Sequence, residues 1–199
     1  MSNAADTPDF GSLLVARHGQ TEWSRSGQHT SFTDLPLLPE GEAQARGLAP
    51  LLAQFSPTRA LSSPLERARR TAELAGFADP EIVPELTEWN YGDYEGRTRS
   101  EIQQDRPGWS IWTGTPEGGE LITDVAARAG HVIATVLPDL EAGNNVVVFS
   151  HGHFSRVLVA TWLGLAPADG RMFILDAGSF GVLGEDRDQR VVRRWNQPS

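Results

Sequence analysis

The sequence contains no cysteine and no lysine, so all 17 basic residues are arginines. The absence of cysteine excludes disulfides, thiolate metal sites and every phosphatase that attacks with a cysteine nucleophile. The absence of lysine excludes the Walker A phosphate loop, Schiff-base chemistry and serine–lysine hydrolase pairs, because each needs an ammonium group. Any phosphate site in this chain must therefore be built from arginine, histidine and backbone N–H groups, and arginine offers a planar fork that suits a phosphate.

Long apolar runs and a surplus of positive charge are missing as well. No stretch approaches the roughly 20 apolar residues that span a bilayer, and the N-terminus has neither the basic region nor the apolar core of a signal peptide. The net charge of -9 repels polyanions, and the arginines are dispersed along the chain. We therefore expect a cytoplasmic protein that acts on small molecules, with neither nucleic acid nor membrane as partner. A homodimer is compatible with the sequence.

The length and the order of elements predict one α/β domain over residues 1–199, with residues 1–10 as a flexible tail. The expected strands span residues 12–16, 59–62, 146–149, 179–184 and 190–195, and the expected helices span 39–55, 64–76, 120–140 and the stretch from Gly152 to Gly164. Because strands alternate with helices, we predict a three-layer α/β/α sandwich, a mostly parallel sheet flanked by helices.

One helix start and two cap loops stand out in this pattern. Ser63-Pro64-Leu65-Glu66 matches a capping box with proline at the first helical position, so a helix is predicted to begin at Pro64. The segments 19–39 and 85–119 show no sustained hydrophobic periodicity of a helix or a strand, and they are expected to form a cap over the site. The second is rich in tryptophan and tyrosine, and its rings either face the substrate or form a second small core.

Two histidines each follow an apolar strand directly. One strand runs into Arg17-His18-Gly19 and another into His151-Gly152-His153. Ligands of open α/β sheets bind beyond the carboxyl ends of the strands, so these junctions can bring His18 and His151 into one crevice. The pattern therefore predicts a site for phosphate chemistry, in which the small glycines let the backbone approach the anion.

The first junction resembles the phosphohistidine motif of the histidine phosphatase superfamily, which also contains the phosphoglycerate mutases. That motif is Arg17-His18-Gly19-Gln20-Thr21-Glu22-Trp23-Ser24, and the likeness covers about residues 12–184. Five further blocks follow in the order of the family: Ser26-Gly27-Gln28-His29-Thr30 with Thr33-Asp34-Leu35-Pro36, Ser63-Pro64-Leu65-Glu66-Arg67-Ala68, Glu88-Trp89-Asn90-Tyr91-Gly92-Asp93-Tyr94-Glu95-Gly96, Pro116-Glu117-Gly118-Gly119-Glu120 and Ser150-His151-Gly152-His153. The blocks are most similar to those of acid phosphatases and sugar bisphosphatases, which implies a phosphoglycerate mutase-like fold and hydrolysis of phosphomonoesters.

The resemblance and the chemistry of the residues together assign five catalytic roles. His18 is expected to attack phosphorus as a neutral imidazole and to carry the phosphoryl group, because neighbouring arginines lower the pKa of an imidazole. Arg17 and Arg67 are expected to bind the equatorial phosphate oxygens, and His151 to donate a further hydrogen bond. Glu88 stands at the place of the family's acid and is expected to protonate the leaving group and then to activate water.

Three alternatives stay open at this point. Glu85 could replace Glu88 as the acid. A phosphoglycerate mutase-type phosphotransferase is less favoured, because the mutases carry a basic, lysine-containing stretch after their acid, whereas Trp89-Asn90-Tyr91-Gly92 follows here. The third alternative is a non-catalytic protein that binds a phospholigand, and it is less favoured because binding alone would need no proton donor. No metal or organic cofactor is expected, since no carboxylate cluster completes a metal site with His151 and His153.

The residues expected to contact the substrate are Arg17, Gly19, Ser24, Thr30, Ser31, Arg67, Glu88, Tyr91 and Gly152. Two of them depart from the family pattern, in which many members have asparagine at the place of Ser24 and glycine at the place of Ser31. A serine still donates one hydrogen bond, so we expect a phosphate loop that is modified and functional.

Overall fold

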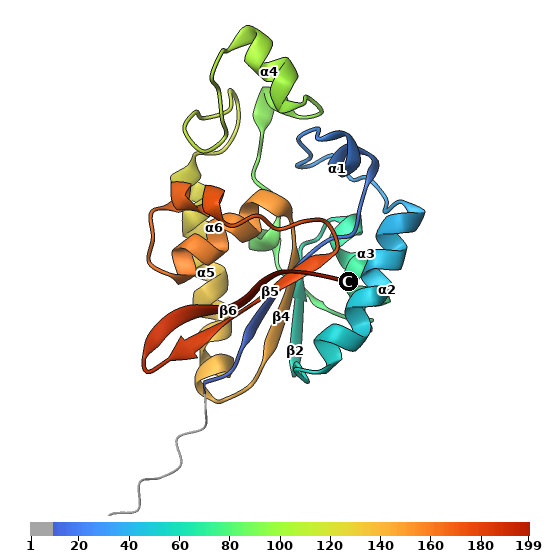
Figure 1. Cartoon of the computed structure of the whole chain (residues 1–199), viewed down its shortest axis with the longest axis vertical. Coiled ribbons are helices and arrows are strands. Elements are labelled where there is room, and N and C mark those ends of the chain that lie inside the picture. Colours follow the sequence, from blue (N-terminus) through green and yellow to red (C-terminus); the bar gives the residue numbers. More distant parts are fainter. Residues whose placement is uncertain (1–9) are drawn as a thin grey trace, which may run out of the picture.

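A computed structural model describes residues 10–199, and residues 1–9 of the predicted flexible tail lie outside the described residues. Six strands form one mixed sheet in the order β3-β2-β4-β1-β5-β6 (Figure 1). Their bounds are β1 Leu13–Arg17, β2 Arg59–Ser62, β3 Glu81–Ile82, β4 Val146–Ser150, β5 Ser179–Asp186 and β6 Gln189–Pro198. The first four strands in this order pair in parallel, whereas β5 and β6 run antiparallel. The prediction of a mostly parallel sheet is confirmed.

Helices cover both faces of this sheet. The α-helices are α1 Glu22–Ser26, α2 Pro39–Ala53, α3 Glu66–Leu74, α4 Arg99–Asp105, α5 Ile122–Glu141 and α6 Gly152–Trp162, and the 3₁₀ turns are η1 Pro84–Leu86, η2 Gly92–Tyr94 and η3 Pro167–Met172. Helices α2 and α3 share one buried cluster with the sheet, while α5 and α6 share another on the opposite face. This arrangement confirms the three-layer sandwich. None of the helices within residues 10–199 has both the length and the apolar character needed to cross a bilayer.

The apolar side chains of strand β1 pack against the helices on both faces of the sheet. Its side chains alternate between the two faces, as successive residues of a strand must. Leu13 and Val15 pack against the α5 and α6 side, whereas Leu14 and Ala16 pack against the α2 and α3 side, and all four are fully buried. The strand is therefore apolar over its whole buried length, and the first polar residues come only where it leaves the sheet.

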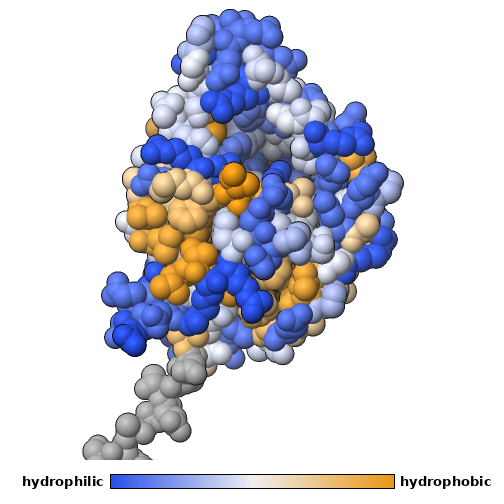
Figure 2. Space-filling model, in the orientation of Figure 1, coloured by the Kyte–Doolittle hydropathy of each residue, from blue (hydrophilic) through white to orange (hydrophobic). Residues whose placement is uncertain are grey.

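A cap lies beyond the carboxyl ends of the parallel strands. In Figure 1, α1 and α4 lie above this end of the sheet, and Figure 2 shows the surface hollowed between the projection that carries α4 and the body below it. Both helices are absent from the sequence-based expectations, although each carries a capping box, Thr21 with Ser24 in α1 and Thr98 with Glu101 in α4. They are only five and seven residues long, too short for an apolar period to be visible.

The predicted start of α3 at Pro64 is wrong. The helix begins at Glu66, its N-cap residue is Leu65, and no side chain caps it. The Ser63 hydroxyl lies instead 2.8 Å from Nε2 of His151. Ser63, which the sequence pattern assigns to a helix cap, thus forms a hydrogen bond with His151 at the end of β4.

Candidate active site

The strands β2, β4 and β1 are neighbours, and a polar residue follows the end of each. The backbone ladder continues for one step beyond β1 and β2, since the N–H of His18 donates to the Ser150 carbonyl and that of Ser63 donates to the Phe149 carbonyl, each at 3.0 Å. This step fixes the direction in which the chain leaves the sheet. As expected from the sequence, His18 and His151 come together, with ring centroids 5.2 Å apart.

The His18 imidazole is held in one orientation and in one protonation state. Burial, with the charges of Arg67 and Arg17 adding to it, lowers its pKa well below the ordinary value of 6.5. The ring is therefore neutral near pH 7. Its Nδ1 lies 2.7 Å from the Gly19 carbonyl oxygen. Because a carbonyl only accepts hydrogen bonds, Nδ1 carries the proton, and Nε2 is left with a free lone pair for attack on an electrophile.

The second histidine, His151, lies deeper and uses both ring nitrogens within the protein. It is fully buried, and burial together with the charge of Arg67 lowers its pKa well below the ordinary value. Nε of Arg67 donates to its Nδ1 at 3.2 Å, so Nε2 bears the proton and donates to the Ser63 hydroxyl at 2.8 Å. To donate to a phosphate oxygen, Nε2–H of His151 has to leave Ser63.

The first cap segment folds around the guanidinium of Arg67. This side chain is fully buried, and its Nη atoms donate to the carbonyl oxygens of Thr33 at 3.0 Å and Ser31 at 2.9 Å. The N–H of Ser31 in turn donates to the carboxylate of Glu95 at 2.9 Å. Ser31 itself is 1% exposed. In this arrangement Ser31 holds Arg67 through its backbone, and its side chain does not line the cavity described below.

Arg17 reaches the same site from the end of β1. One Nη donates to the Leu175 carbonyl at 2.7 Å, while its buried Nε has no hydrogen-bond partner in the described part of the chain. A Cβ at Gly152 would lie 3.1 Å from the guanidinium carbon, so the glycine leaves the room that Arg17 occupies. A buried N–H without a partner is costly unless a ligand accepts from it, which marks Arg17 as a donor for an anion.

The first turn of α6 fixes the carboxylate of Glu88. Its Oε1 accepts from the N–H groups of Trp89 at 2.9 Å and Phe154 at 2.8 Å, and its Oε2 accepts from that of His153 at 3.0 Å. Glu88 is 6% exposed and lines the cavity, whereas Glu85 does not. Of the two candidate acids, only Glu88 thus faces the space in which a substrate can bind.

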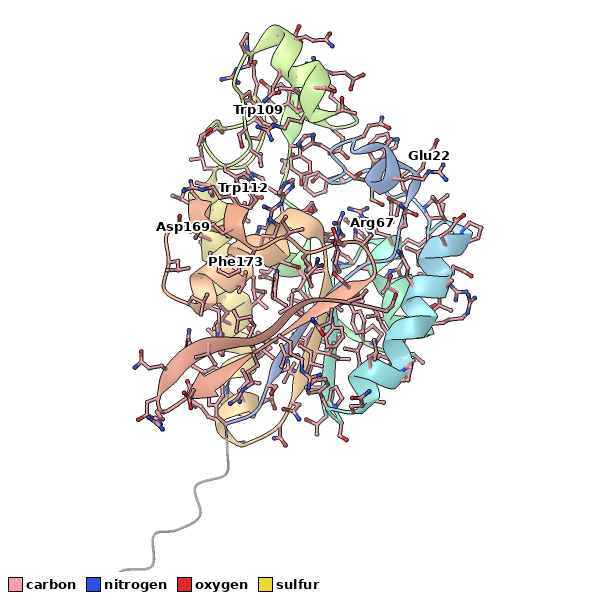
Figure 3. All side chains as sticks on the ribbon, viewed as in Figure 1. Glu22, Arg67, Trp109, Trp112, Asp169 and Phe173 are labelled. Atoms are coloured by element: carbon pink, nitrogen blue, oxygen red, sulfur yellow. The ribbon has the colours of Figure 1, made fainter. Side chains whose placement is uncertain are left out.

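A cavity of about 470 Å³ joins these groups to the cap. The predicted site residues that line it are Arg17, His18, Ser24, Thr30, Glu88, Tyr91 and Gly152. Four others do not, namely Gly19, Ser31, Arg67 and His151. In Figure 3, Arg67 lies at the upper end of the sheet, below the labelled tryptophans of the cap.

Gly19 has a packing role that the sequence analysis did not anticipate. Its N–H donates to the Thr71 hydroxyl at 3.0 Å and is therefore engaged within the protein. A Cβ at this position would lie 2.2 Å from the Gly41 carbonyl oxygen, closer than any real contact. The glycine lets the end of β1 approach the first turn of α2, so its contribution to the site is indirect.

Two histidines that the sequence analysis did not place among the site residues, His29 and His153, line the cavity. Their rings stack with centroids 6.1 Å apart and an interplanar angle of 10°, and the Tyr91 hydroxyl lies 2.6 Å from Nδ1 of His153. Burial lowers the pKa of His153 well below its ordinary value and raises that of Tyr91 well above 10.0, so the tyrosine donates to a neutral imidazole. Nothing in their spacing distinguishes these rings from core residues, because only the cap brings them together.

The aromatic segment of the cap divides between core and cavity. Trp89 is 1% exposed and donates from its indole to the Glu120 carbonyl at 2.9 Å, so it belongs to the core. Tyr91 lines the main cavity, and Trp109 and Trp112 line an adjoining one. Part of the segment thus forms core, as one alternative predicts, and part of it lines the cavities. Within residues 10–199, no group of three or more histidines and carboxylates is arranged to hold a metal ion.

A three-layer α/β fold with histidines, arginines and a carboxylate gathered at the strand ends defines an enzyme of the phosphoryl-transfer class. The chain belongs to the histidine phosphatase superfamily (branch 1), whose family model matches residues 13–198. It is 36% identical over 182 residues to an acid phosphatase of Mycobacterium tuberculosis, with 90% of this chain and 89% of the relative covered. It is 34% identical over 183 residues to sedoheptulose 1,7-bisphosphatase of Saccharomyces cerevisiae, with 76% and 67% covered.

Among solved structures, the product of an open reading frame from Mycobacterium tuberculosis superimposes with a TM-score of 0.90. It is 34% identical to this protein, and the match covers 94% of this chain and 98% of that one. The family and the phosphoglycerate mutase-like fold expected from the sequence motifs are thereby confirmed.

Proposed function

We propose that this protein hydrolyses phosphomonoesters of small metabolites, sugar phosphates or bisphosphates among them, through a phosphohistidine on His18. The observation that carries the proposal is the hydrogen bond from Nδ1 of His18 to the Gly19 carbonyl, which leaves Nε2 unprotonated beside the guanidinium groups of Arg17 and Arg67. The names of the relatives, an acid phosphatase and a sugar bisphosphatase, support this substrate class. The net charge of -9 fits a cytoplasmic enzyme whose partners are small molecules and not nucleic acid.

The first half of the reaction transfers the phosphoryl group to the protein. Nε2 of His18 attacks phosphorus, the bond from phosphorus to the ester oxygen breaks, and a proton from Glu88 goes to the departing alcohol. Arg17 and Arg67 carry the charge of the equatorial oxygens, and His151 donates to one of them after exchange of its Ser63 partner. The products of this half are a free alcohol and a phosphorylated imidazole.

The second half returns the enzyme to its starting state. The Glu88 carboxylate takes a proton from a water molecule, whose oxygen attacks phosphorus while the phosphorus–nitrogen bond breaks. Inorganic phosphate leaves, and Glu88 is again protonated. One water is consumed for each ester, and no metal ion or organic cofactor takes part.

A generic aryl phosphate assay tests this proposal. We expect the purified protein to release nitrophenol from p-nitrophenyl phosphate with full activity in excess chelator, because the arginines supply the positive charge and neutral histidines supply the nucleophile and a hydrogen-bond donor. Activity that appears only after a divalent metal is added would contradict the mechanism. In a parallel assay, conversion of 3-phosphoglycerate to its 2-isomer with a bisphosphate primer, in the absence of phosphate release, would indicate the mutase alternative.

Ser63→Ala is expected to lower KM about tenfold, the equivalent of ~1.4 kcal/mol, because Nε2–H of His151 can then donate to a phosphate oxygen without first giving up its hydrogen bond to the Ser63 hydroxyl. The change in kcat should be small, since that hydrogen bond is already exchanged once the phosphate is bound. Ser155→Ala is the matched control, because this serine is also fully buried and its hydroxyl has no partner within residues 10–199. Steady-state kinetics of both variants checks the prediction, and equal effects of the two changes would show that Ser63 does not compete with the phosphate for His151.

A further inference from the structure

A second cavity of about 530 Å³ adjoins the first on the side of the cap. The residues that line both are Gly27, His29, His153, Arg156 and Arg171. The stacked rings of His29 and His153 thus form part of the wall of each cavity. The two cavities are therefore adjacent, and a ligand whose phosphate sits on His18 would reach the second one by passing these rings.

The charged side chains that line this second cavity are all arginines. Three arginines line it, Arg99, Arg156 and Arg171, and none of the lining residues within the described range 10–199 is acidic. The whole chain, in contrast, carries a net charge of -9. A local concentration of arginine on an acidic protein is the arrangement that attracts and orients an anion at close range.

Arg156 is held by more contacts than the other two arginines. Its Nε donates to the Gly170 carbonyl at 3.2 Å and one Nη to the Arg171 carbonyl at 2.7 Å, and its guanidinium lies 4.6 Å from the ring centroid of Trp112. The side chain is thus held in place by carbonyls and an aromatic ring, and none of the carboxylates within residues 10–199 forms an ion pair with it.

The surroundings of Arg156 favour an anion on this side chain. Burial lowers its pKa most, the charge of Arg17 in the phosphate site adds to the shift, and the charge of Glu88 opposes it. Arg171, next to it, has one acidic neighbour, Asp169, at 3.7 Å. A negatively charged group between these arginines would offset the repulsion that Arg156 and Arg17 exert on one another.

We propose that Arg156 and Arg171, with Arg99 from the cap, form a second anion subsite, and that the preferred substrate is a phosphomonoester with a phosphate or carboxylate at its far end. The inference rests on the proposed phosphatase function. The ester phosphate lies on His18, the carbon skeleton crosses the wall of His29 and His153, and the distal anion binds the arginines. A substrate without the distal anion loses this last contact and binds less well.

Matched synthetic esters test the subsite. For straight-chain α,ω-alkanediols of increasing length, we compare the bisphosphate, the ω-carboxyalkyl phosphate and the ω-hydroxyalkyl phosphate. At the length that spans both sites, kcat/KM of an ester with a distal anion should exceed that of the hydroxyalkyl ester by about tenfold or more. Because a bisphosphate has two reactive ends, a twofold advantage is statistical and overturns the proposal.

Two variants remove a charge from the subsite, and a third serves as the control. Arg171→Gln and Arg156→Gln should each remove most of the advantage of the distal anion, whereas Arg69→Gln, which removes the same charge from an exposed position on α3, should leave it unchanged. Arg171→Gln keeps the proposal testable should Arg156→Gln unfold, since the Arg171 side chain is 54% exposed. Loss of the advantage in Arg69→Gln as well would mean that long-range charge alone is responsible, and would overturn the subsite.

The outcomes separate this inference from the proposed function. A higher kcat/KM for the bisphosphates alone or for the carboxylates alone supports the subsite and identifies its anion. No gain in kcat/KM for either, with normal turnover of the hydroxyalkyl ester, overturns the subsite and leaves the phosphatase function intact. Should no ester be hydrolysed, calorimetric titration of the bisphosphate into the unmodified protein and Arg171→Gln decides, and equal affinities would overturn the subsite.

Discussion

His18→Ala is expected to abolish hydrolysis of every phosphomonoester, with a loss in kcat of about 10³-fold or more. The reason is that no other side chain at the site combines an unprotonated nitrogen with two arginines beside it. His151 has both ring nitrogens engaged by Arg67 and Ser63 and cannot take over. The loss should be equal on aryl and alkyl esters, because formation of the phosphorus–nitrogen bond is common to both.

The same prediction has a chemical readout. When the unmodified protein is quenched during turnover of a labelled ester, the label should be found on the chain, stable to base and released by acid, as expected for a phosphorylated imidazole. His18→Ala should carry none. His131→Ala, which alters an exposed histidine of α5, serves as control and should label and turn over normally. An acid-stable label, or a label that persists in His18→Ala, would contradict the mechanism.

The sequence predicts the layers of this fold and the place of the nucleophile because both follow from local patterns. A strand buried on two faces is mainly apolar, as β1 and β4 are up to their last residues, Arg17 and Ser150, and the histidine that follows each then lies at the carboxyl edge of the sheet. Since β1 and β4 pair in register, the two histidines meet. The meeting of His18 and His151 can therefore be predicted without any information about the cap.

The partners of these residues could not be predicted, because they come from distant parts of the chain. Ser63 fits the pattern of a helix cap, yet it contacts His151, 88 positions away. Arg67 lies in the first turn of α3, but the carbonyls that hold it belong to a loop with no regular pattern. Likewise, a glycine at position 19 suggests an anion site, whereas its actual neighbour is the backbone of Gly41.

Glu88→Gln is expected to separate substrates by their leaving groups. An alkyl alcohol is a poor leaving group and needs a proton, so loss of the acid should lower kcat/KM on alkyl phosphates by about 10²- to 10⁴-fold. Nitrophenolate leaves without a proton, so the first step on p-nitrophenyl phosphate should be largely spared. The ratio of the two kcat/KM values is the measurement, and because both come from one protein sample, any fraction of misfolded enzyme cancels.

Glutamine also tests how the carboxylate is held. Both oxygens of Glu88 accept from backbone N–H groups, and an amide nitrogen at either place would face the N–H of His153 or those of Trp89 and Phe154. We therefore expect a loss of stability of about 1–3 kcal/mol, seen as a lower melting temperature. The kinetic ratio does not depend on this loss.

Glu85→Gln provides the matched control for the acid. Its side chain lies outside the cavity, so it should leave the ratio of alkyl to aryl turnover unchanged. Equal losses of kcat/KM on alkyl and aryl esters in Glu88→Gln would exclude proton donation by Glu88. Its role would then be to accept hydrogen bonds from the first turn of α6. A selective loss of alkyl turnover in Glu85→Gln would reassign the acid to a residue that must first move into the cavity. The two variants thus decide which carboxylate serves the leaving group, independently of the evidence for His18.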